Sequence, residues 1–279
     1  MKPNSKPTVY EELQDVSDGE EDPDGVTIKK SIIVCHRLFH NSNLNLLKTI
    51  FSADFDFYHR LVHDQTVEKS ISKAGTFQRS DVMRMLSEQF VRDNTLDMYM
   101  DCLKRKLSES KNSQWRNICF LPTAHLLLLT DPVLSTKYKS SSFRLIRNID
   151  QYDIAIWPVN IGNFHWALIY HSLQSGSPLF YLDSWGDDET RRSRMSPAIL
   201  DAINEFFKRY NKTFAWTSAS FVKVPQQHMN DCGPVVNELM RRLMMNESVV
   251  DFELNKAIGV RLRITQTRDI LAHITSQGL

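Results

Sequence analysis

The chain has 279 residues, of which 42% are hydrophobic and 24% charged, and its formal net charge is +1 at pH 7. This composition is typical of a globular protein with one substantial core. A nucleic-acid-binding protein needs Lys and Arg clustered in excess, so the near-neutral balance argues against nucleic acid as a partner. The apolar runs are too short for a membrane span, and we expect no membrane association.

The chain contains four cysteines, Cys35, Cys102, Cys119 and Cys232. They are too few and too irregularly spaced for a disulfide framework, and no Cys-x-x-Cys pair indicates a zinc or redox site. We therefore expect a reducing compartment, the nucleus or the cytoplasm, and a monomer that uses neither metal nor cofactor.

The N-terminal quarter differs in composition from the rest of the chain. Residues 1–30 combine prolines with the acidic block Asp18-Gly19-Glu20-Glu21-Asp22 and are predicted to be a disordered acidic tail. Residues 31–74 show no clean helical or strand period and are interpreted as an accessory N-terminal extension. Residues 75–279 carry the regular patterns and are predicted to form the main domain.

Within that domain, capping residues and apolar spacing predict helices and strands in alternating blocks. Ser80-Asp81 favours the start of a short helix, and Asn94 favours the start of a longer one over 95–106. Apolar runs at 154–159, 166–170 and 179–182, separated by turn-forming residues, predict buried strands of a central, mostly antiparallel sheet.

The C-terminal part of the domain is predicted to be largely helical. Ser196-Pro197 begins a helix that extends to residue 209, and Cys232 begins another, because apolar residues recur at helical spacing behind Gly233-Pro234. A last helix is expected over 256–274. Helices lying outside a sheet core give the class α+β.

Three segments far apart in the sequence carry side chains suited to nucleophilic catalysis. They are Phe164-His165-Trp166, the strand-end Asp183 and the Asp231-Cys232-Gly233 motif. A thiol attacks a carbonyl efficiently only as the thiolate, which needs a base, an orienting group for that base and a donor for the oxyanion. A cysteine at a helix N-terminus has a lowered pKa, so we expect the Cys232 thiol to be ionised before substrate arrives.

The remaining roles also have candidates. Asp183 is placed to accept a hydrogen bond from Nδ1 of the His165 ring and fix its tautomer. Gln226 and Gln227 precede Cys232 closely enough for one of them to donate to the oxyanion.

These residues resemble the ubiquitin-like-protein-specific proteases, also called sentrin-specific proteases, whose site combines a His-Trp pair, a strand-end Asp and a Gln-containing loop before Asp-Cys-Gly. The resemblance extends over residues 75 to 279 and implies a papain-like architecture. It implies Cys232 as nucleophile, His165 as base and then acid, and Asp183 as orienter. It implies Gln226 as the oxyanion donor. Relative to the family pattern, the loop before Cys232 is one residue shorter, and if the missing residue falls after Gln227, Gln227 becomes the alternative donor.

The resemblance also implies a narrow tunnel for the substrate tail. Trp166 corresponds to the indole that covers the tunnel, and Phe90 stands where the family has a second Trp. A flat aromatic roof excludes residues with a Cβ, so two consecutive glycines would pass beneath it. Asp93 is expected to meet an arginine of the modifier.

The function implied is cleavage after the C-terminal Gly-Gly of a ubiquitin-like modifier, either from lysine conjugates or from a precursor. SUMO is the first choice of modifier and the Nedd modifier the second. A bacterial effector with deubiquitinase or acetyltransferase activity, delivered to a host cytosol, is a third possibility. A non-catalytic module that holds a modifier in the groove is the alternative from another class.

Overall fold

The computed structural model describes residues 77–86, 89–110, 112, 114–126, 148–174, 176–217 and 220–276. All of these belong to the unit Ser70–Leu279. The predictions for residues 1–30 and 31–74 lie outside the described residues.

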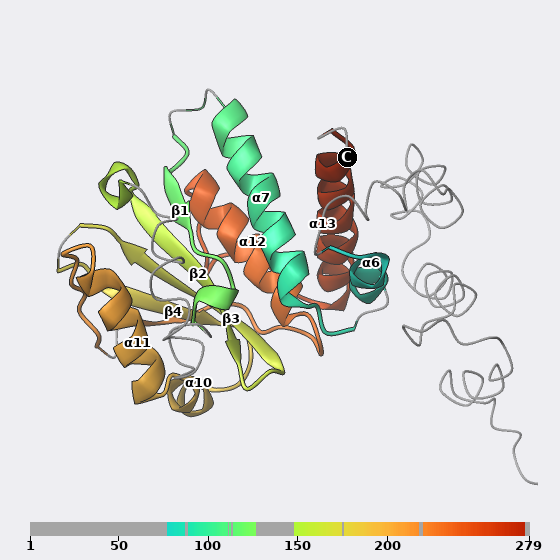
Figure 1. Ribbon diagram of the computed structural model, residues 1–279. Helices are drawn as coiled ribbons and strands as arrows, with labels where there is room; N and C mark the ends of the chain where they lie inside the picture. The colour runs from blue at the N-terminus through green and yellow to red at the C-terminus, as the bar shows by residue number, and fades with distance from the viewer. Residues whose placement is uncertain are drawn as a thin grey trace, which may run out of the picture. The chain divides into compact units, whose positions relative to one another are not determined.

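A five-stranded mixed sheet forms the centre of this unit (Figure 1). Its strands lie in chain order: β1 (Ile118–Phe120), β2 (Ile154–Ile161), β3 (His165–Ser172), β4 (Leu179–Asp183) and β5 (Phe221–Lys223). The pairs β2–β3 and β3–β4 are antiparallel, whereas the short edge strands β1 and β5 pair in parallel with their neighbours. The prediction of a central sheet dominated by antiparallel pairs holds for its long strands.

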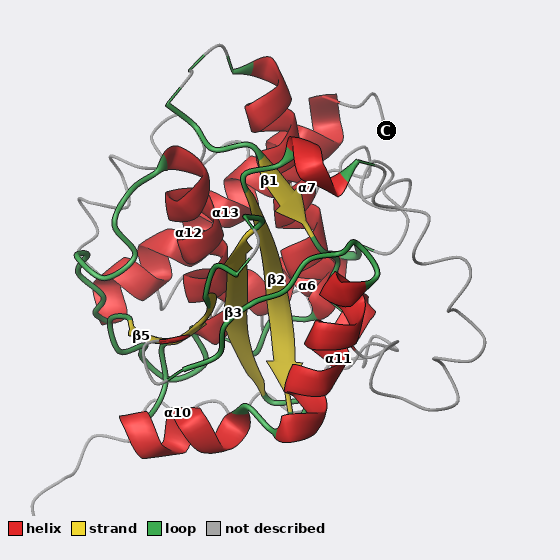
Figure 2. Cartoon of the chain, turned by 90° about the vertical axis from the view of Figure 1, so that its left-hand side faces the viewer, coloured by secondary structure: helices red, strands yellow, loops and turns green. Residues whose placement is uncertain are grey.

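Helices cover both faces of the sheet (Figures 1 and 2). On one side, α12 packs on β3, on α7 and on α13, and α13 also packs on α6. On the other side lie α10 and α11, which face the viewer in Figure 2. The bounds are α6 (Arg79–Leu86), α7 (Asp93–Glu109), α10 (Asp188–Arg194), α11 (Pro197–Lys208), α12 (Cys232–Met245) and α13 (Lys256–Ser276), with a short 3-10 helix, η2 (Ile149–Gln151), before β2. The predicted α+β class is confirmed.

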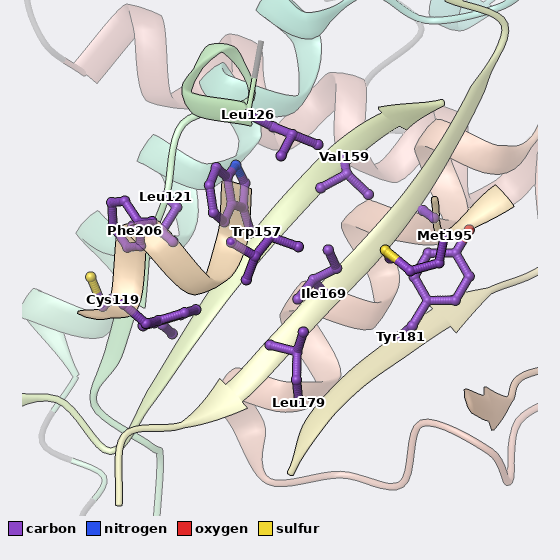
Figure 3. Packing of buried hydrophobic residues seen from close by; sticks show 14 of the residues in the cluster. Cys119, Leu121, Leu126, Trp157, Val159, Ile169, Leu179, Tyr181, Met195 and Phe206 are labelled. Atoms are coloured by element: carbon purple, nitrogen blue, oxygen red, sulfur yellow. The ribbon is translucent and has the colours of Figure 1, made fainter. Parts of the chain in front are cut away.

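A hydrophobic core lies between the sheet and α11 (Figure 3). Alternate strand residues face one side of a sheet, so Trp157 of β2, Ile169 of β3 and Tyr181 of β4 share this layer. The Trp157 ring lies 5.2 Å from that of Phe206 on α11. Strand residues that point to the opposite face of the sheet, such as Leu168 in β3, are also buried. The strands therefore have continuous apolar sequences instead of an alternating pattern.

Several predicted element boundaries are confirmed and others need correction. Ser196 caps α11, where its hydroxyl oxygen accepts a hydrogen bond from the N–H of Ile199 at 3.4 Å, and Cys232 begins α12. The longer N-terminal helix starts at Asp93, so Asn94 lies inside its first turn instead of capping it.

Two sheet edges and one helix were not predicted. The strands β1 and β5 have three residues each, too few for a period to appear, and α10 is a polar segment without an apolar face. In the described part of the chain, no helix combines the length and apolar character that crossing a membrane requires.

Candidate active site

A tight hairpin turn sets the position of His165 at the start of β3. Gly162 and Asn163 between β2 and β3 have φ angles of +63° and +62°, a left-handed conformation that glycine and asparagine adopt most readily. The N–H of Phe164 donates to the carbonyl of Ile161, closing the turn at 3.4 Å. His165 follows at once and is buried, with 1% of its surface exposed.

Asp183 ends β4 with its carboxylate bonded to both His165 and the residues around it. Oδ1 lies 2.7 Å from His165 Nε2 and accepts the Trp185 N–H at 2.9 Å. Oδ2 accepts the Tyr181 hydroxyl at 2.8 Å and Nη1 of Arg194 at 2.8 Å. Four donors thus hold a carboxylate that is only 1% exposed.

These bonds determine the ionisation of the pair. Burial raises the pKa of the Asp183 carboxyl, but the bonds from His165, the Trp185 N–H and Arg194 outweigh burial and bring the pKa below its usual range. Asp183 is therefore an anion at neutral pH. Burial, followed by the charge of Asp183, raises the pKa of the Tyr181 hydroxyl, which stays a donor.

The orientation of the imidazole differs from the prediction. We expected Nδ1 to face Asp183, whereas the structure places Nε2 there, at 2.7 Å. Because the ionised carboxylate can only accept, Nε2 carries the proton and Nδ1 is the ring nitrogen with a free lone pair.

Cys232 occupies the first position of α12 and lies beside the start of β3. The backbone N–H groups of Trp166 and Gly233 donate toward its sulfur. Trp166 is the residue that follows His165, so α12 and β3 bring the thiol and the imidazole into one neighbourhood.

The ionisation of the thiol also differs from the prediction. Cys232 is 2% exposed, and burial raises the pKa of its thiol above the usual value in spite of the two N–H donors and the charge of Arg263. Burial of the sulfur therefore opposes the lowering of the thiol pKa that we expected from the helix N-terminus.

The two glutamines of the preceding loop have different surroundings. Gln226 is exposed, and its Oε1 accepts a bond from Arg191 at 3.4 Å. Gln227 is half-buried, its Oε1 accepts the Ser184 hydroxyl at 2.7 Å and its N–H donates to the Ser184 carbonyl at 2.8 Å. Ser184 directly follows Asp183, so Gln227 contacts the segment that carries the candidate orienting carboxylate, whereas Gln226 contacts α10.

The predicted tail-binding residues gather around a single pocket of about 490 Å³. Phe90, Asp93 and Trp166 all line it, together with Asn160 and Asn163. The rings of Phe90 and Trp166 lie nearly parallel, with an interplanar angle of 11° and centroids 6.2 Å apart. Trp166 is fixed in place because its indole N–H donates to the Val91 carbonyl at 2.8 Å.

The sequence matches the model of one protein family, described as the Ulp1 protease family, C-terminal catalytic domain, over residues 89–277, more than half of the chain. The chain belongs to the Ulp1 protease family. It is therefore a cysteine-type peptidase, as the His-Asp-Cys pattern predicts. No protein with a curated description matches it.

Solved structures of Ulp1-family proteases share the fold. The SUMO protease Ulp1 with its catalytic cysteine oxidised to a sulfinic acid is 17% identical, with a TM-score of 0.56 over 76% of this chain and 94% of that one. The C-terminal Ulp1 protease domain in complex with Smt3, the yeast ortholog of SUMO, is 18% identical, with a TM-score of 0.55 over 75% and 95%. A further structure, described as the de-sumoylating protease, is 16% identical, with a TM-score of 0.50 over 72% and 88%.

The Asp231-Cys232-Gly233 motif is fixed by contacts from segments distant in sequence. Arg263 of α13 bonds Oδ1 of Asp231 at 2.7 Å and the carbonyl of Asn230 at 2.6 Å, and its guanidinium is 1% exposed. Gly233 packs so closely on Val91 that a Cβ there would collide with the valine side chain. The start of α12 is thus fixed from both sides.

Sequence reasoning missed four residues of this site: Tyr181, Trp185, Arg194 and Arg263. Tyr181 lies two residues before Asp183 in a strand, and the period of two would have placed it on the same face. Trp185 follows Asp183 by two residues, and no sequence motif indicates that its backbone N–H donates to the carboxylate. The two arginines lie on helices, and their contacts depend on the tertiary fold. Within the described residues, no group of His, Cys, Asp or Glu is arranged to hold a metal.

Proposed function

We propose that this Ulp1-family protease cleaves after the C-terminal Gly-Gly of a ubiquitin-like modifier, with residues 75–279 as the catalytic domain. One observation carries the proposal: His165 forms a buried bond with Asp183, and the next residue of its strand, Trp166, directs its backbone N–H at the Cys232 sulfur. A base with its orienting carboxylate next to a nucleophile is the arrangement that acyl transfer requires.

In the proposed mechanism, Nδ1 of His165 takes the proton of the Cys232 thiol. The sulfur attacks the carbonyl carbon of the last glycine, and the carbonyl electrons move onto oxygen. The tetrahedral intermediate collapses as His165 returns the proton to the leaving amine, which gives a thioester. Water, deprotonated by His165, then attacks the thioester and releases the modifier acid and the free thiol.

Two features of the resting site shape this mechanism. Burial raises the pKa of the Cys232 thiol, so the mechanism assigns His165 the task of taking its proton. We propose the carboxamide of Gln227 as the oxyanion donor, because it is held by Ser184 and by the Met229 carbonyl, to which its Nε2 donates at 2.7 Å. Gln226, the first choice from the sequence, becomes the alternative.

The pocket supports a Gly-Gly tail as the substrate. A residue with a side chain would have to part the nearly parallel rings of Phe90 and Trp166, whereas a glycine pair presents only backbone. Asp93 lines the same pocket and is exposed, so it is available to an arginine upstream in the tail.

Among modifiers, SUMO is proposed first, because proteases with this fold include the SUMO protease Ulp1 and its complex with Smt3. The Nedd modifier and ubiquitin are the alternatives. The proposed site of action is the nucleus or the cytoplasm, or a host cytosol for a bacterial effector.

Propargylamide derivatives of SUMO, the Nedd modifier and ubiquitin test this proposal directly. The expected result is an adduct at Cys232, mapped by mass spectrometry, that forms fastest with the SUMO probe. Cys119→Ser is the matched control, because burial raises the pKa of that thiol to about 12 and its loss should leave labelling unchanged. Fastest labelling by another probe would replace SUMO, and labelling by none would refute the proposed substrate class.

A further inference from the structure

Arg194, the last residue of α10, binds two parts of the site at once. Its Nη1 donates to Asp183 Oδ2 at 2.8 Å and to the Trp185 carbonyl at 2.5 Å. The guanidinium carbon also lies 4.6 Å from the centre of the Trp185 ring, a cation–π distance. Its side chain is 11% exposed, so these contacts are largely shielded from water.

The local chain is built to accommodate this guanidinium. Gly186 has a φ of +89°, and a Cβ there would lie 3.2 Å from Arg194 Nη2. Asp187 then caps α10 by accepting the Thr190 N–H at 2.8 Å, which sets the direction in which the helix runs back toward Asp183.

The other arginines of α10 have different contacts. Arg191 reaches Gln226, and Arg192 is exposed, with its guanidinium carbon 5.7 Å from the centre of the Phe221 ring. Arg194 is therefore the cation of this helix that bonds the carboxylate of the proposed triad.

Trp185 connects this arrangement to the imidazole. Its ring lies 5.3 Å from the His165 ring, while Arg194 stacks on the same indole. When His165 takes the thiol proton, the site holds an imidazolium and a guanidinium around one carboxylate. The guanidinium opposes that protonation, because like charges repel in a buried site.

We propose that Arg194 is a positioning residue of this protease, which fixes Asp183 and the Trp185 indole around His165 and sets the pH range over which the site is active. The proposal rests on the proposed function, since it assigns Arg194 a part in the same proton transfer.

The charged and titratable groups near the pair come from four elements. On the carboxylate side these are Tyr181 of β4 and Arg191 and Arg194 of α10, with Asp187 at the start of that helix near Arg194. On the thiol side they are Asp231 and Arg263. Changing Arg194 alone leaves all the others in place.

The test is the pH dependence of kcat/KM for a modifier carrying a C-terminal fluorophore, measured for Arg194→Met and Arg194→Lys. Arg194→Met removes the positive charge that is bonded to Asp183, so both limbs of the profile should move to higher pH, by about one unit. Arg194→Lys keeps the charge and loses the planar guanidinium that stacks on Trp185, so its limbs should stay in place while kcat falls. Arg192→Met, on the exposed side of α10, should match the wild type in both respects.

If the pH profile of kcat/KM for Arg194→Met has the same limbs as the wild type, the proposal is overturned, whether or not the rate falls. A purely structural role would change the rate and leave the pH profile unchanged. If Arg194→Met does not fold, Arg194→Gln, which keeps an N–H donor without the charge, must show the same displacement. Labelling of the wild type by the Gly-Gly probes separates the two proposals. If the wild type is labelled but the pH profile of Arg194→Met does not move, only the role of Arg194 is rejected. If the wild type is not labelled, the proposed function is rejected.

Discussion

The substitution Arg263→Met removes the guanidinium that holds the loop before the nucleophile. Arg263 bonds Asp231 at 2.7 Å, and its remaining N–H groups donate to carbonyls that include Asn230 at 2.6 Å and Gln89 at 3.0 Å. Methionine keeps much of the apolar stem but satisfies none of these acceptors. The substitution therefore leaves a carboxylate that is 5% exposed without its ion-pair partner.

Loss of one partner from a buried ion pair costs about 3–5 kcal/mol in free energy of unfolding, because the other charge stays buried. For a domain of about 200 residues each kcal/mol changes Tm by roughly 2–4 °C, so Arg263→Met should lower Tm by about 6–20 °C. Arg261→Met, at an exposed position of the same helix, should change the free energy of unfolding by no more than about 0.5 kcal/mol.

Urea denaturation followed by circular dichroism gives the free energies, and Asp231→Asn completes a double-mutant cycle. The double variant should be more stable than the sum of the single losses predicts, by about 1–3 kcal/mol, because it no longer buries an unpaired charge. A loss below about 1 kcal/mol in Arg263→Met, or strict additivity in the cycle, would show that the pair does not hold the loop.

Three further outcomes are expected. Cys232→Ser should lower kcat by about 10⁴-fold or more and retain affinity for a Gly-Gly tail peptide in calorimetry, whereas turnover within tenfold of wild type would contradict its role as nucleophile. Trp166→Ala opens the pocket, so cleavage of tails with Ala in place of Gly should improve relative to Gly-Gly in competition assays; unchanged discrimination would argue against the aromatic wall. Because the pKa of Asp183 is lowered in the folded protein, the ionised carboxylate contributes its full stabilisation above pH 3.8, the ordinary pKa of an aspartate, and this contribution is lost as the pH falls below that value. The free energy of unfolding of Asp183→Asn should therefore depend less steeply on pH in this acid range. The same dependence in the variant and the wild type would refute the assignment.

The parts of the fold that the sequence predicts are those encoded by local patterns. The long apolar strands, Ser196-Pro197 at a helix start and Cys232 at another are all found where spacing and capping place them. The strand β5 lacks such a signal, because a three-residue edge strand is formed by its pairing with β4 rather than by its own period.

The site shows the same division. The candidate residues His165, Asp183 and Cys232 could be chosen by residue type and order, yet three details required the fold. They are the imidazole nitrogen that meets Asp183, the contact of Gln227 with Ser184 and the burial that raises the pKa of the thiol. Each depends on burial or on a contact between segments far apart in the chain, which no short motif contains.

Trp166 serves the site in three ways: its backbone N–H faces the thiol, its ring walls the pocket and its indole N–H fixes Val91. Replacing the Trp166 side chain keeps its backbone N–H beside the thiol but removes both the pocket wall and the bond to Val91, whose side chain packs against Gly233 at the start of α12. A change at Phe90 alters the same pocket wall and leaves the hydrogen bonds around the sulfur in place.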